Sequence, residues 1–176
     1  MTISAKLKKF YLDNNLPENG GTEEDYFNLK FRFFSLKIPN YEFRKNVLYI
    51  HDIQHILYDC DITWKGEAFI AGWEIATGFW KHLPIGFASI WAMGVSLLLH
   101  PKEVVNGYKA GLQVTGLIDL KIDKEQLLSY TVKEVETLLR RDTVLSFNPY
   151  IFVMWILISL FIVFSPLIVG LLLVFL

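Results

Sequence analysis

The chain has 176 residues, enough for one domain with a substantial core and few for two. A net charge of −1 and the lack of a basic stripe exclude the electrostatic signature of a nucleic-acid-binding protein. Cys60 is the only cysteine, which excludes an internal disulfide bond and fits a reducing compartment.

The N-terminal part is predicted to consist of helices separated by turn signals. Residues 1–22 are expected to form an amphipathic or linker segment without the apolar core of a signal peptide, able to lie on a membrane surface. Thr22 suits the N-cap of a helix over residues 23–37, whose first-turn acidic side chains favour the helix dipole. After an Ile-Pro pair, Asn40 suits the N-cap of a helix over residues 41–59.

Four more segments have the apolar spacing of helices. The uncharged segment 85–99 is short for a membrane span, which indicates a buried or membrane-skimming helix. Asp123 and Gln126 form a weak variant of a capping box at the start of the last segment. The predicted helices cover residues 65–76, 85–99, 102–117 and 123–141. Because no segment alternates as a strand does, the predicted fold class is all-α, with a single helical domain over residues 23–145.

The C-terminal segment 150–176 contains no charged residue. As a helix it would be about 40 Å long, which exceeds the roughly 30 Å hydrocarbon layer of a bilayer. We therefore expect residues 149–176 to form a transmembrane helix, a single-pass tail anchor. Arg140 and Arg141 precede it and favour a cytoplasmic N-terminal domain.

Residues 49–74 concentrate metal-binding side chains. His51 and His55 are four residues apart, so their rings project from one face of a helix. Asp52 lies beside the first, and Glu67 begins the next predicted helix. Two imidazoles and two carboxylates fit a divalent metal, zinc above all, and also iron or manganese if positions stay open to water or substrate.

The same spacing allows other interpretations. Two histidines four residues apart also occur by chance, and Asp52 stands where the zincin motif has a glutamate general base. Asp59 continues the histidine face by one turn, and Glu74 lies two turns beyond Glu67. Asp59 and Glu74 are therefore candidate catalytic groups, although for Glu74 a solvated helix charge is equally compatible.

The stretch "HDIQHILYDCDITWKGE" contains the pattern His-Asp-x-x-His-x(11)-Glu, as His51, Asp52, His55 and Glu67. It resembles the motif of the Coq-four family of coenzyme Q biosynthesis. "GEAFIAGWEIATG" and "NGYKAG" resemble later segments of that family, and the likeness extends over residues 23–141. The chain departs from the family in three respects. Asp59 stands where the family usually has glycine, the aromatic cluster usual near the family's C-terminus is missing, and the apolar tail has no counterpart in the typical member.

The resemblance implies an all-helical, membrane-associated domain in which His51, Asp52, His55 and Glu67 bind the metal. It also implies an apolar channel for an isoprenoid tail, for which the 85–99 segment is our candidate wall. The implied activity is removal of the ring carboxyl group of a prenylated hydroxybenzoate-type precursor, coupled to hydroxylation at the same carbon.

The expected partners are the membrane, an isoprenoid or quinone lipid and other quinone-biosynthesis proteins, with no nucleic acid; association of the chain with its own copies is left open. The alternative from another class is a non-enzymatic lipid-binding scaffold that presents quinone intermediates to partner enzymes. A third hypothesis is hydrolysis of a membrane lipid by metal-bound water, for which the motif lacks a neighbouring Lys/Arg cluster.

Overall fold

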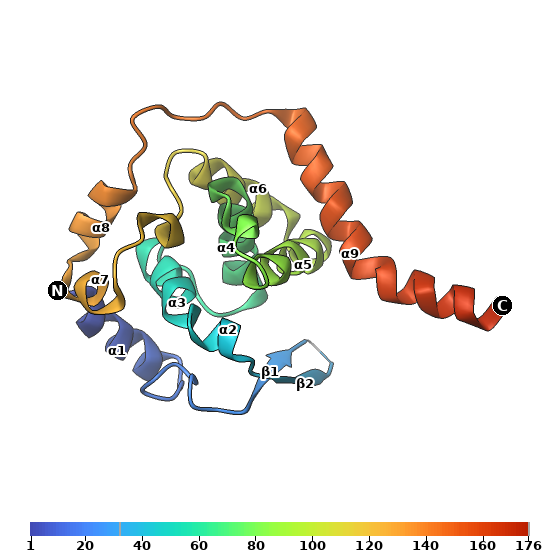
Figure 1. Ribbon diagram of the computed structural model, residues 1–176, viewed down its shortest axis with the longest axis horizontal. Coiled ribbons are helices and arrows are strands. Elements are labelled where there is room, and N and C mark those ends of the chain that lie inside the picture. Colours follow the sequence, from blue (N-terminus) through green and yellow to red (C-terminus); the bar gives the residue numbers. More distant parts are fainter. Residues whose placement is uncertain (32, 176) are drawn as a thin grey trace. The chain divides into compact units, whose positions relative to one another are not determined.

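The computed structural model describes residues 1–31 and 33–175, and the side chains of 171, 172, 174 and 175 are not described. The protein is mostly helical, with one small two-stranded hairpin and a long apolar C-terminal helix (Figure 1). The chain divides into two compact units. The first comprises Met1–Asp59 and Ile122–Val135, and the second comprises Cys60–Lys121 and Glu136–Leu176. The domain boundaries expected from the sequence stay predictions.

The first unit begins with helix α1 (Ile3–Asp13), which the sequence predicted as an amphipathic segment. The Thr2 hydroxyl accepts a hydrogen bond from the Ala5 N–H and caps the helix. Ile3, Leu7 and Tyr11 recur every four residues and are buried. This face packs against α3 (Leu48–Leu57) and α7 (Lys124–Ser129), so it is not left for a membrane surface.

The helix predicted over residues 23–37 is wrong. This segment forms an antiparallel hairpin of strands β1 (Tyr26–Lys30) and β2 (Ser35–Pro39). Aromatic and branched side chains favour strands, and Phe27 opposite Ile38 and Leu29 opposite Leu36 give the hairpin one apolar face. The Thr22 hydroxyl donates to the Asn19 carbonyl instead of capping a helix. The prediction of an all-α fold therefore fails in this segment.

The helix predicted over residues 41–59 is divided into α2 (Glu42–Lys45) and α3. Asn40 is not the cap of α2, whose N-cap position is Tyr41. The buried Asn40 amide instead donates to the carbonyls of Gly21 and Glu24, each at 2.9 Å. Asn40 therefore fixes the loop before the hairpin.

The second unit is built around α4 (Trp64–Thr77), α5 (Ile85–Leu99) and α6 (Pro101–Gly111). The first two match their predicted ranges within one residue, and α6 ends six residues earlier than expected. Thr63 caps α4 by accepting from the Lys65 N–H. The helices pack around an apolar cluster that includes Ile75, Met93 and Tyr108. Short 3-10 helices, η1 (Phe79–Lys81) and η2 (Leu117–Leu120), connect the longer ones.

The region predicted as one helix over residues 123–141 contains two, α7 and α8 (Val132–Leu139). Asp123 caps α7 as expected, since its Oδ1 accepts from the Glu125 and Gln126 N–H groups. Tyr130 is extended and ends α7. Glu134 accepts from the Thr131 backbone and hydroxyl groups, which forms a capping box for the second helix.

Helix α9 (Pro149–Phe175) is the predicted C-terminal apolar helix. Its segment Pro149–Gly170 is long and apolar enough to cross a membrane, and little of it is buried within the protein. The buried side chains Phe152, Trp155 and Ser159 lie on one face in the half that packs against α5. The Ser159 carbonyl lies so close to α5 that a Cβ added at Gly94 would be 2.5 Å from it.

Candidate metal centre

The two histidines of the motif lie on α3, one turn apart. Their Nε2 atoms are 3.2 Å apart, and their ring centroids are separated by 4.9 Å. His55 is only 1% exposed, whereas His51 is half-buried. Phe10 of α1 packs on the His55 ring at 5.9 Å between centroids. One imidazole is thus held firmly in the unit, while the other keeps access to solvent.

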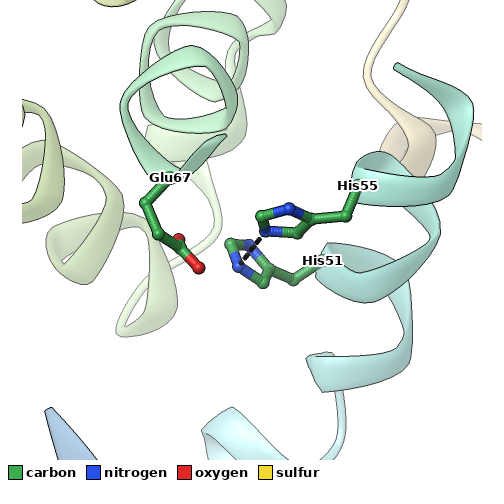
Figure 2. A group of neighbouring side chains, drawn as sticks. All are labelled: His51, His55 and Glu67. Carbon is green, nitrogen blue, oxygen red and sulfur yellow. Dashed lines mark hydrogen bonds between the residues drawn. The ribbon is translucent and has the colours of Figure 1, made fainter. Parts of the chain in front are cut away.

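Glu67 lies in the first turn of α4, where a carboxylate is favoured by the helix dipole. Its backbone N–H donates to the Thr63 carbonyl at 2.9 Å. Figure 2 shows the carboxylate and the two imidazoles directed toward one another; one ligand atom from each side chain lies within 4.8 Å of the others. The structure therefore contains a His-His-Glu cluster that could hold a metal ion.

The donor set and its spacing fit a divalent metal. Zinc binds imidazole nitrogen at about 2.0–2.1 Å with tetrahedral angles, which places two such nitrogens about 3.3 Å apart. The observed Nε2 separation of 3.2 Å agrees with that value. Two nitrogens and one carboxylate oxygen, all within 4.8 Å of one another, form a donor set that could hold one such ion. Three protein ligands leave a fourth position for water or substrate, as in catalytic sites.

Asp52, the fourth expected ligand, is not part of this cluster. Its side chain is buried, and its Oδ2 accepts a hydrogen bond from the Tyr11 hydroxyl at 2.9 Å. Burial raises the pKa of Tyr11 well above its ordinary value of 10.0, and the nearby Asp52 charge and the hydrogen bond add to this. The described contact of Asp52 thus connects α3 to α1, and its role as a ligand stays a prediction.

The two candidate catalytic carboxylates lie in contrasting environments. Asp59 is exposed and follows the end of α3 in the left-handed conformation, with φ +50°. Asp is one of the few residue types other than glycine that adopt this conformation readily. Glu74 is 4% exposed, and the Ser89 hydroxyl of α5 donates to its Oε2 at 2.5 Å. Glu74 is therefore not a solvated helix charge, and both catalytic roles stay predictions.

Sequence reasoning missed Tyr11 and Ser89 as partners of these carboxylates. Tyr11 lies on the apolar side of an amphipathic helix, where an aromatic residue is usually only part of the core. Ser89 is a single small polar residue in the uncharged α5 segment. Neither position carries a signal that indicates its partner, because the hydrogen bonds join residues 41 and 15 positions apart.

No protein-family model matches the chain, and no curated protein or solved structure shows significant similarity to it.

Proposed function

We propose that the chain is a membrane-anchored, metal-dependent protein of prenylquinone biosynthesis, of the kind the Coq-four family represents. The observation that carries this proposal is the cluster of His51, His55 and Glu67, which brings together three of the four residues of the motif. The proposed substrate is a prenylated hydroxybenzoate-type acid, whose ring carboxyl group is replaced by a hydroxyl group. This replacement is a two-electron oxidation that releases the carboxyl carbon as carbon dioxide. We propose dioxygen as the oxidant, which is reduced to hydrogen peroxide, with water supplying the remaining oxygen and hydrogen atoms.

Each residue of the cluster has a distinct part in the proposed site. His51 and His55 hold the ion through neutral imidazole nitrogens, and Glu67 supplies an anionic oxygen that offsets part of its charge. When bound, a divalent metal supplies Lewis acidity toward the carboxylate or phenolate of the ring. The half-exposed side chains of His51 and Glu67 leave room for the polar ring to approach. Glu74, held by the Ser89 hydroxyl, is our candidate proton carrier.

The membrane part of the proposal is supported by α9. We propose that it acts as a tail anchor and that the preceding Arg140 and Arg141 keep the N-terminal part cytoplasmic. Prenylated acids reside in the bilayer, so an anchored protein meets them within two dimensions. On α5, Phe87, Leu98 and Leu99 are exposed apolar side chains suited to contact an isoprenoid tail.

The test uses the detergent-solubilised full chain and the substitutions His51→Ala and Glu67→Ala. His100→Ala is the matched control, since His100 is also half-buried but is outside the cluster. Metal content, thermal unfolding and conversion of a carboxylated prenyl-phenol are measured for each. We expect the two cluster variants to lose metal and turnover while remaining folded, and His100→Ala to keep both.

A different outcome favours the scaffold hypothesis. If the parent protein binds metal but converts no carboxylated prenyl-phenol, and both cluster variants unfold, the ion has a structural role. A parent protein that binds no divalent metal contradicts the proposal altogether.

A further inference from the structure

The β1–β2 hairpin of the first unit carries exposed aromatic and basic side chains. Phe33 at its tip is 86% exposed, and the neighbouring Phe34 is 57% exposed. We define the hairpin surface by the exposed side chains of Tyr26, Lys30, Phe33, Phe34, Leu36 and Lys37. Large exposed apolar groups gathered in one place indicate an interaction site more often than scattered ones do.

The strand register gives the hairpin two different faces. Phe27, Leu29, Leu36 and Ile38 lie on one face, because they form two directly opposed pairs. Asn28, Lys30, Ser35 and Lys37 lie on the other face. The apolar face is incompletely covered, since Leu36 remains 45% exposed. An isolated two-stranded hairpin is at best marginally stable in water, so a partner that contacts its tip would stabilise it.

The base of the hairpin is fixed to its own unit. The Arg44 guanidinium of α2 lies 4.0 Å from the centroid of the Phe27 ring, and its Nη1 donates to Asn40. The Asn40 backbone N–H donates to the Asp25 carbonyl at 2.8 Å. Among the described elements, β1 and β2 pack mainly on each other (Figure 1). The tip is therefore presented from an anchored base rather than folded back onto the core.

The charge of the segment has one sign. Residues 26–41 contain three basic residues and no acidic one. The Lys37 ammonium lies 4.4 Å from the centroid of the Tyr26 ring, and the Phe31 and Phe34 rings stack at 4.7 Å. Aromatic rings next to lysines are the composition of membrane interfaces, where rings enter the headgroup region and ammonium groups meet anionic lipids.

We propose that the hairpin surface docks on an anionic lipid bilayer, with Phe33 and Phe34 inserted at headgroup level and Lys30 and Lys37 against lipid phosphates or carboxylates. Charge complementarity and the exposed aromatic tip select this partner, and α9 is long and apolar enough to cross such a bilayer. The proposal does not depend on the metal chemistry proposed above. It gives the first unit its own contact with the membrane.

The test reports on the tip in the full chain, reconstituted through α9 into vesicles. In a Cys60→Ser background, Ser35→Cys carries an environment-sensitive fluorophore, because Ser35 is exposed beside the tip and its replacement keeps every ring. The control is a label at Glu125→Cys, an exposed position on α7 of the same unit. Emission and quenching by spin-labelled lipids are measured in phosphatidylcholine vesicles with increasing phosphatidylserine.

We expect the label at residue 35 to shift to the blue and be quenched as phosphatidylserine rises, while the label at residue 125 stays in water. Replacing both lysines, by Lys30→Gln and Lys37→Gln, should lower the equilibrium constant for docking of the hairpin about 25-fold, which is about fivefold for each lysine. Phe33→Ser with Phe34→Ser should abolish the shift while the circular dichroism spectrum is unchanged. A label at residue 35 that stays in water at every composition overturns the proposal, as does an equal response at residue 125.

Discussion

At the scale of residues, the buried hydrogen bond between Tyr11 and Asp52 connects α1 to α3. Replacing Tyr11 by Phe keeps the ring and removes only the hydroxyl group. It leaves a buried carboxylate oxygen without this donor, so we expect the free energy of unfolding to fall by about 1–3 kcal/mol at pH 7. Chemical denaturation measures this. Tyr130→Phe is the control, because the Tyr130 hydroxyl bonds Gln126 at an exposed position and should matter little.

The same substitution should change the pH dependence of stability. Because the pKa of Tyr11 is raised in the folded state, its stabilising effect is complete below the unfolded value of 10.0 and is lost as pH rises above it. The parent should lose about 1.4 kcal/mol more per pH unit above 10 than Tyr11→Phe does. Parallel stability curves for the two proteins above pH 10 would contradict this assignment.

Metal binding should stabilise the protein only while both imidazoles are present. Free zinc at 100 times its dissociation constant adds about 2.7 kcal/mol to the free energy of unfolding. We therefore expect zinc to raise the unfolding temperature of the parent and of His100→Ala, and chelation to reverse the shift. His55→Ala should show no zinc-dependent shift at the same concentration; an unchanged shift would place the ion elsewhere.

At residue scale, the sequence predicts those features of the site that depend on the spacing of residues along one helix. The four-residue separation placed His51 and His55 on one helical face, and the motif added Glu67. The surroundings of Asp52 and Glu74 could not be predicted, because their partners Tyr11 and Ser89 lie on other helices. Spacing along a helix says which side chains share a face, but not which distant hydroxyl group will meet them.

At the scale of elements, α4 and α6 touch through their backbones. A Cβ added at Gly107 would lie only 1.8 Å from the Phe69 carbonyl oxygen, so Gly107→Ala must push the two helices apart. We expect it to reduce the free energy of unfolding by about 1–3 kcal/mol, measured by denaturation in detergent. Gly170→Ala, with open space around it, should cost nothing because alanine favours a helix.

The predicted elements were most accurate where apolar spacing was long and uninterrupted. Helices α4, α5 and α9 match their expected ranges closely. The segment 26–39 was misassigned because its closely spaced aromatic residues fit a helix as well as a strand, and only cross-strand pairing distinguishes them. The split at Tyr130 was also missed, because no proline or glycine marks it.

At the scale of the whole molecule, α9 contributes both to the core of the second unit and to the apolar surface. A chain ending at Leu160 keeps Phe152, Trp155 and Ser159 but leaves a helix of about 18 Å, too short to span a bilayer. We expect this protein to keep the thermal stability of the second unit and to lose retention by membranes. A chain ending at Asn148 should lose both, with about 3–6 kcal/mol less stability from two unburied aromatic side chains.

Flotation with vesicles and thermal unfolding separate these outcomes. If the chain ending at Leu160 is as unstable as the one ending at Asn148, the packing of Phe152 on Tyr108 and of Trp155 on Trp80 is not what the second unit requires.

At Gly94, α5 lies so close to the Ser159 carbonyl of α9 that not even a methyl group fits between the two helices. The space between them is therefore narrower than an acyl chain. Neither a lipid nor a detergent molecule fits into such a seam, so solubilisation should coat the two helices jointly and leave their contact dry. After extraction in a mild detergent, α5 would then lie in the same micelle as α9. Antibodies or proteases directed at residues 85–99 would therefore reach them poorly until the detergent is removed.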